Sequence, residues 1–93
     1  MQFEWDRRKD RLNRLKHGVS FETATLVFDD PHAFSVLDRI ENDEERWQTI
    51  GMAGGVLLLL VAHTYRDADD ERIRIFSARK ATPRERQLYD ENL

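Results

Sequence analysis

The sequence contains no cysteine and no long hydrophobic segment, and these absences exclude several classes of protein. Without cysteine the chain has neither a disulfide framework nor a thiolate metal site. Its longest apolar run, residues 56–62, has seven residues, far below the roughly 20 that a membrane-crossing helix needs. The polar N-terminus is unlike a secretory signal peptide. We therefore expect a single domain, residues 1–93, in the cytoplasm, with no membrane, metal or cofactor.

Acidic residues outnumber basic ones overall, 18 to 15, yet the basic residues are concentrated in two segments. The formal net charge of -3 argues against a protein that coats nucleic acid non-specifically. Residues 7–17 hold six Lys or Arg against one acid, residues 72–86 hold six against one acid, and residues 38–45 hold five acids against one Arg. We expect separate basic and acidic surfaces, with an anion such as phosphate as the ligand of the C-terminal basic segment.

The first third of the chain predicts two short helices. Asp6 and Gly18 are suitable caps for a helix over residues 7–17, whose inward pair we expect to be Leu12 and Leu15. Ser20 is a second N-cap, followed by a stripe at helical spacing that consists of Phe21, Ala24, Thr25 and Phe28.

The period changes from helical to strand-like after Pro31. Four strands are predicted, with an acidic loop over residues 39–45, a glycine hairpin at residues 53–55 and a turn at residues 67–70. The first strand begins near Phe34, and the other three cover residues 46–50, 56–64 and 72–78. In the last strand we expect Ile73 and Ile75 on one face, toward the helices, and Arg72, Arg74 and Phe76 on the other. Thr82, Pro83 and Glu85 form a capping box for a last helix over residues 83–91. The order predicts an α+β fold, a four-stranded antiparallel meander with its helices on one face.

The order and spacing of several short motifs resemble the BrnT-type toxins, a branch of the RelE-like ribonuclease group. The motifs are Phe3-Glu4-Trp5-Asp6 with Lys9, Lys16-His17-Gly18-Val19-Ser20-Phe21, Val27-Phe28-Asp29-Asp30-Pro31, Glu45-Arg46-Trp47 with Ile50-Gly51, His63-Thr64 with Arg66, and Arg72-Ile73-Arg74-Ile75 running into Ser77-Ala78-Arg79.

The resemblance implies a RelE-like fold and the activity of a type II toxin-antitoxin toxin that cleaves RNA and inhibits translation. It also implies a BrnA-like antitoxin with a ribbon-helix-helix domain, through which alone the toxin would reach operator DNA. The expected substrate is mRNA. Arg7 stands where many relatives have proline, and arginine also suits a first helical turn.

Metal-free RNA cleavage needs groups that move protons and groups that stabilise the charged phosphorane. Histidine is the side chain best matched to proton transfer at neutral pH, and we predict His63 in that role. Arg74 and Arg79 are the predicted charge stabilisers, since guanidinium offers two parallel donors to phosphate. Residues predicted to grip flanking phosphates or stack on bases are Arg46, Trp47, Tyr65, Arg66, Arg72 and Lys80.

Each assignment has a structural alternative. His63 can be a strand-end histidine bonded to a turn, and Trp47 can belong to the core. Arg72 and Arg74 can form ion pairs with nearby acids, namely Asp67, Asp69, Asp70 or Glu71. The basic run of residues 7–16 can be a solvated helix face or can contact RNA or an acidic antitoxin segment.

Two other functions compete with the ribonuclease hypothesis. The acidic total charge, with no second acid-base residue beside His63, fits a catalytically inactive module that keeps the toxin fold for antitoxin binding and transcriptional autoregulation. A DNA-binding regulator that acts alone is the poorer interpretation, because the sequence has no recognition helix with base-reading residues.

Overall fold

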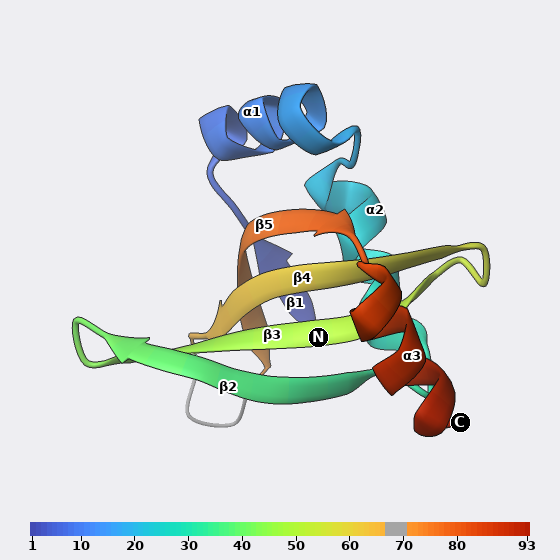
Figure 1. Ribbon diagram of the computed structural model, residues 1–93. Coiled ribbons are helices and arrows are strands. Elements are labelled where there is room, and N and C mark those ends of the chain that lie inside the picture. Colours follow the sequence, from blue (N-terminus) through green and yellow to red (C-terminus); the bar gives the residue numbers. More distant parts are fainter. Residues whose placement is uncertain (67–70) are drawn as a thin grey trace.

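A computed structural model of the chain describes residues 1–66 and 71–93 (Figure 1). The elements in chain order are β1 (Gln2–Glu4), α1 (Arg7–His17), α2 (Phe21–Thr25), the 3-10 helix η1 (Leu26–Asp29), β2 (Phe34–Glu41), β3 (Glu44–Ala53), β4 (Leu57–Tyr65), β5 (Arg72–Lys80) and α3 (Pro83–Glu91). The α+β prediction is confirmed. The turn predicted at residues 67–70 lies outside the described residues.

The strands form one mixed sheet in the order β1-β5-β4-β3-β2. The antiparallel meander β2 to β5 was predicted, whereas β1 was not. This strand runs parallel to β5, with Phe3 opposite Ile73 and the Gln2 N–H bonded to the Glu71 carbonyl at 2.7 Å. The predicted acidic loop is also shorter than expected, because β2 and β3 extend to a two-residue turn, Asn42-Asp43, with positive φ at both positions.

Local capping signals determine the helix ends. The Asp6 carboxylate accepts from the backbone N–H groups of Arg8 and Lys9, and Gly18 closes α1 in the left-handed conformation at φ 70°. The capping box that joins Thr82 and Glu85 opens α3. The predicted second helix is divided into α2 and η1. Within residues 1–66 and 71–93, the helices are all too short or too polar to cross a bilayer.

The inward residue of α1 is Asn13, and the predicted pair Leu12 and Leu15 was wrong. Leu12 and Leu15 are 53% and 79% exposed, whereas Asn13 is buried. Its side-chain amide donates to the carbonyls of Val19 and Ala78 and accepts from the Ala78 N–H. The buried Asn13 amide, whose hydrogen bonds are satisfied, therefore joins α1 to β5 in place of apolar packing.

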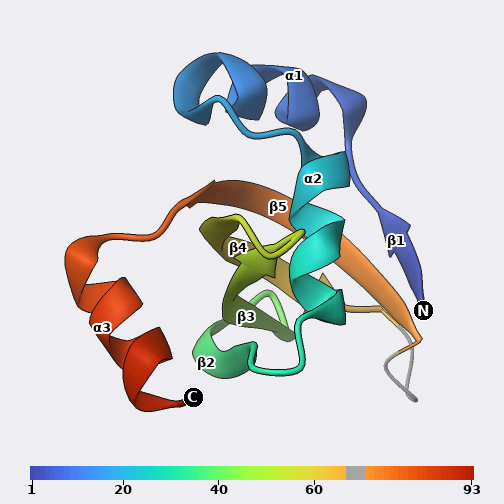
Figure 2. The ribbon, with the colours of Figure 1, turned by 90° about the vertical axis from the view of Figure 1, so that its right-hand side faces the viewer.

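Helices cover both faces of the sheet, so the prediction of one covered face was also wrong. On β4, Leu59 and Val61 pack with α2 and η1, while Leu58 and Leu60 pack with Tyr89 of α3. Figure 2 shows α2 and α3 on opposite sides of the sheet. We call these two sides the α2 face and the α3 face.

One close approach fixes η1 and the start of β2 against the α2 face. A Cβ at Gly51 of β3 would lie 2.8 Å from side-chain atoms of both Val27 and Ala33. Glycine therefore allows the backbone of β3 to pass beneath η1 at a distance that no other residue permits.

Candidate functional site

Three arginines gather on the α3 face because of strand register. Ile73 and Ile75 are buried in the core on the α2 face, so the alternation of β5 places Arg74 on the α3 face. Arg74 is opposite Thr64 on β4, and Arg46 comes one residue before Trp47, the partner of His63. Arg39 on β2 is opposite Arg46. Arg46, Arg74 and Arg79 are each only partly exposed.

A bulge in β5 brings an aromatic ring to these arginines. His63 is opposite Ile75, but Ala62 is opposite Ser77, which leaves Phe76 as the extra residue. Ile75 and Ala78 on either side are buried in the core of the α2 face, so Phe76 and Ser77 both lie on the α3 face. The Arg46 guanidinium sits 3.9 Å from the centroid of the Phe76 ring, the arrangement of a cation–π pair.

Arg79 is held in place from α3. Its guanidinium donates two parallel hydrogen bonds to the Glu85 carboxylate, at 2.8 and 2.9 Å. These hydrogen bonds lower the pKa of Glu85 and raise the pKa of Arg79, so both groups stay ionised at neutral pH. Arg79 thus presents a fixed planar donor beside the basic cluster, although its charge is neutralised within the chain.

The structure places His63 away from these arginines. Its side chain has no exposed surface, lies on the α2 face, and packs edge-on against Phe28 and Tyr65. Nε2 is 2.6 Å from the Thr49 hydroxyl, and Nδ1 has no hydrogen-bond partner among the described residues. Burial lowers the pKa of His63 to about 4. A neutral, enclosed imidazole cannot reach an RNA ribose, which contradicts the prediction that His63 moves protons in catalysis.

Trp47 and Tyr65 belong with His63 rather than with the arginines. Their rings pack edge to face at 5.9 Å, and both are half-buried on the α2 face. The Trp47 indole Nε1 is buried without a partner among residues 1–66 and 71–93. Core packing, the alternative for Trp47, agrees with this position. Neither ring lies on the face that carries Phe76.

Arg66, Arg72 and Arg74 form ion pairs, although the partner that Arg72 and Arg74 have among the described residues is none of the acids that the structural alternative named. Glu4 of β1 lies 2.8 Å from Arg74 and 3.7 Å from Arg72, and Glu44 lies 3.0 Å from Arg66. Among the acids expected to pair with Arg72 and Arg74, Glu71 lies 3.7 Å from the N-terminal amine instead. Asp67, Asp69 and Asp70 are outside the described residues. Lys80, at the end of β5, is exposed.

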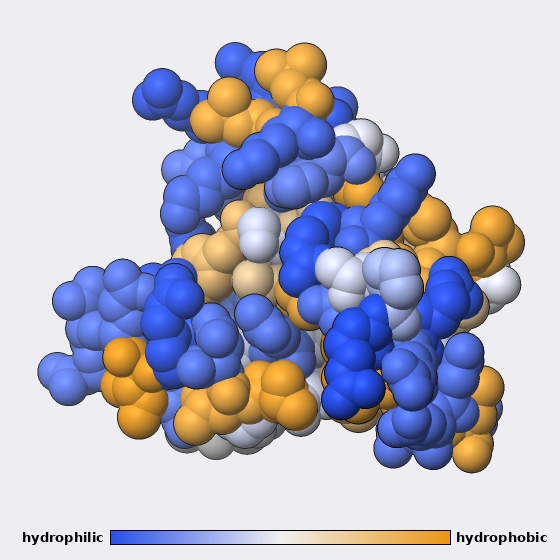
Figure 3. Space-filling model, in the orientation of Figure 1, coloured by the Kyte–Doolittle hydropathy of each residue, from blue (hydrophilic) through white to orange (hydrophobic). Residues whose placement is uncertain are grey.

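The space-filling view shows the α3 face as a recess with mildly apolar residues at its floor; hydrophilic residues surround most of it, and hydrophobic residues lie along its lower edge (Figure 3). Sequence reasoning recognised that Phe76 shares a face with Arg72 and Arg74, but gave it no role. It also missed Glu4 and Glu85, the carboxylates that hold the arginines. The capping-box position of Glu85 was a signal for its place in α3, though not for its bond to Arg79.

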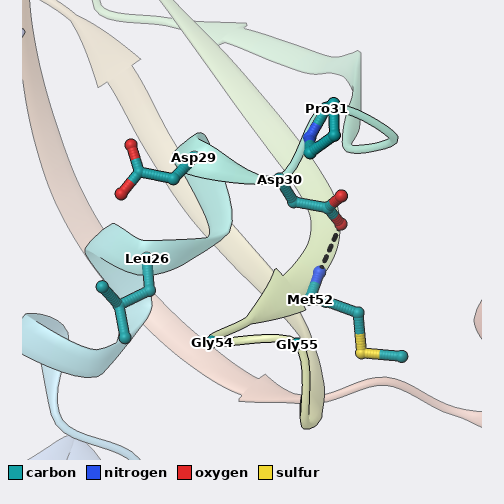
Figure 4. A pocket seen from close by; sticks show the side chains of 7 residues that line it. All are labelled: Leu26, Asp29, Asp30, Pro31, Met52, Gly54 and Gly55. Carbon is teal, nitrogen blue, oxygen red and sulfur yellow. Dashed lines mark hydrogen bonds between the residues drawn. The ribbon is translucent and has the colours of Figure 1, made fainter.

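A second pocket, formed by residues 26, 29–31, 52, 54 and 55, is acidic (Figure 4). Asp30 accepts hydrogen bonds there from the Met52 N–H at 2.7 Å, the Tyr89 hydroxyl at 2.6 Å and the His32 N–H at 2.9 Å. Burial alone would raise the pKa of Asp30, but these bonds outweigh it and the pKa is lowered. Asp30 therefore ties α3 to β3. Among residues 1–66 and 71–93, the acidic and histidine side chains form no cluster suited to a metal ion.

The chain matches a known protein family and is similar to a solved structure. The family described as "Ribonuclease toxin, BrnT, of type II toxin-antitoxin system" matches residues 5–85. The Brucella abortus ribonuclease toxin BrnT has a similar fold, with a TM-score of 0.63 and 23% sequence identity over 88% of this chain and 97% of that one. No curated protein matches the chain.

Proposed function

Because the chain belongs to the BrnT family of ribonuclease toxins of type II toxin-antitoxin systems, we propose that it is an endoribonuclease that works from the α3 face of its sheet without a metal ion. The observation that carries this proposal is that Arg46, Arg74 and Arg79 share the α3 face with Phe76, on which Arg46 packs, in an otherwise acidic chain. Such a cluster can bind a phosphodiester and stabilise the extra negative charge of a phosphorane.

The three arginines divide into two roles. Arg74 and Arg79 stabilise the phosphorane, since each is already oriented by a carboxylate, Glu4 or Glu85. Arg46 packs over one face of the Phe76 ring and so orients the ring, on whose other face a base can stack. Arg66, Arg72 and Lys80 would contact flanking phosphates from the strand ends. His63, enclosed on the other face, is not part of this proposal.

Membership of a type II family implies an antitoxin partner. We propose that this partner is BrnA-like, with a ribbon-helix-helix domain that gives the complex its contact with operator DNA. In the cytoplasm the free toxin would cleave mRNA and so inhibit translation. The test is expression of the chain with and without the adjacent reading frame, with growth and RNA integrity as readouts. Growth arrest without RNA damage would refute the ribonuclease assignment.

One observation favours the alternative of an inactive toxin-fold module. Glu4, Glu44 and Glu85 neutralise arginines that are needed for phosphate binding, and the predicted catalytic histidine is buried. A module of this kind would be harmless when expressed alone and would still bind its antitoxin tightly. The same expression experiment distinguishes the two functions.

A further inference from the structure

A pocket of about 260 Å³ lies between α1 and β5, beside the arginine cluster. It is lined by Lys9, Leu12, Asn13, Lys16, His17, Phe76 and Ser77. Four of these residues follow helical spacing and form one side of α1, namely Lys9, Leu12, Asn13 and Lys16. Because the volume is slightly below the ~300 to 1,000 Å³ of ordinary small-molecule pockets, the pocket suits one part of a longer ligand.

Two features described above build this pocket. The hydrogen bonds of Asn13 to Ala78 hold α1 at a fixed distance from β5, and the β5 bulge turns Phe76 and Ser77 toward the helix. The result is an apolar floor, formed by Phe76 and Leu12, beneath a basic rim.

The basic rim differs from the arginine cluster in its charge balance. In the described part of the chain, no carboxylate lies within ion-pair distance of Lys9 or Lys16, and no acid lines the pocket. The Lys9 ammonium is 5.3 Å from the centroid of the Phe76 ring. Asp6 interacts with Lys9 only beyond ion-pair distance, so among the described residues these two lysines offer an incoming anion a charge that no ion pair neutralises.

We infer that this pocket binds one nucleotide of single-stranded RNA, next to the scissile phosphate at the arginines. The base stacks on the face of the Phe76 ring that Arg46 does not cover, and Lys9 and Lys16 bind the adjoining phosphate. The inference rests on the proposed function, because it names a substrate subsite of the same active face. An acidic peptide would use the lysines but would not need the ring, so the aromatic floor favours the nucleotide.

The test is a fluorescence anisotropy titration with a labelled 2′-O-methyl RNA hexamer, which cannot be cleaved because it has no free 2′-OH. Lys9→Gln/Lys16→Gln is compared with Arg7→Gln/Arg11→Gln, which removes the same charge from the same helix at residues outside the pocket. Each phosphate contact contributes a salt slope of about 0.7 on single strands. Because the two lysines bind one phosphate, the lysine variant should bind about fourfold more weakly at 0.15 M salt, with a slope lower by about 0.7.

Phe76→Leu tests the stacking platform separately, since it keeps an apolar side chain and removes the ring. Loss of one base–aromatic stack predicts affinity lower by between about 5- and 150-fold. Thermal unfolding checks that each variant is folded. If Phe76→Leu binds the hexamer as the unaltered chain does and hexaglutamate competes equally well with RNA, the pocket is a general anion site and the inference is overturned.

The remaining outcomes separate this inference from the proposed function. If the unaltered chain cleaves RNA but both double variants lose affinity equally, the pocket inference fails and the ribonuclease assignment stands. If the unaltered chain neither binds the hexamer nor cleaves RNA, both fail. Selective loss in the lysine and Phe76 variants, with the arginine control within about twofold of the unaltered chain, supports the pocket.

Discussion

Acidification should destabilise this protein through His63, and the size of the effect follows from its environment. The imidazole is fully enclosed, and burial lowers its pKa from 6.5 to about 4. An unfolded chain takes up a proton near pH 6.5, whereas the folded chain resists it until about pH 4. The stability that neutral His63 provides is therefore complete above pH 6.5 and is lost as the pH falls to about 4. At about 1.4 kcal/mol per pH unit, the loss is roughly 3 kcal/mol.

The assay is urea unfolding at several pH values between 7.5 and 4.5, for the unaltered chain and for His63→Gln. Glutamine can keep a hydrogen bond to Thr49 but does not titrate, so carboxylates common to both chains cancel in the difference. The free-energy difference between the two chains should shrink as the pH falls.

The reasoning has a direct check in the titration of the histidine ring signals by NMR. A His63 signal that titrates near pH 6.5 would refute the enclosed, neutral imidazole. A difference between the two chains that does not vary from pH 7.5 to 4.5 would refute it as well. In either case His63 would again be available as the acid-base group that the sequence suggested.

Three further changes test the packing. Asn13→Ala should lower the free energy of unfolding by about 1 to 3 kcal/mol, since it leaves buried backbone groups of β5 unpaired. Leu15→Ala, at a 79% exposed position, should change that free energy by less than about 0.5 kcal/mol. Equal effects of the two substitutions would contradict the account of α1. Gly51→Ala should cost about 1 to 3 kcal/mol because its Cβ meets η1, and thermal unfolding at an unchanged midpoint would exclude that contact. Burial and the hydrogen bond to Asp30 raise the pKa of Tyr89 to about 12, so the stability that this tyrosine provides is complete below about pH 10 and is lost as the pH rises toward 12. Absorbance titration should show a late-ionising tyrosine that Tyr89→Phe removes. A titration curve that this substitution leaves unaltered would be inconsistent with the hydrogen bond.

Local signals predicted most of the fold. The caps at Asp6, Gly18 and Thr82 were read correctly because a helix end depends on the few residues around it. The faces of β5 also followed from its alternation, with Ile73 and Ile75 inward.

Other features depend on contacts between distant parts of the chain. β1 is a three-residue strand whose partner lies 70 positions away, and without it the pairing of Glu4 with Arg74 could not be foreseen. The prediction for α1 failed because Asn13 is buried through bonds to β5, which its polarity does not suggest.

The position of His63 could not be predicted from its strand. The run of residues 56–62 is apolar on both faces, so the alternation did not show which face η1 covers at the end of β4. Phe28 and Thr49, which enclose the imidazole, come from other elements. The same limit applies to Phe76, because the bulge that exposes it is a property of the β4–β5 pairing.

The central claim is that the α3 face cleaves RNA through its arginines, and one measurement tests it most directly. End-labelled RNA is incubated with purified protein in EDTA, with Arg79→Gln and the control Arg84→Gln, an exposed residue of the same basic segment. We predict cleavage with 2′,3′-cyclic phosphate ends, a rate lower by roughly 10²- to 10³-fold for Arg79→Gln, and an unchanged rate for Arg84→Gln. Intact RNA with the unaltered chain, or full activity of Arg79→Gln, would contradict the account.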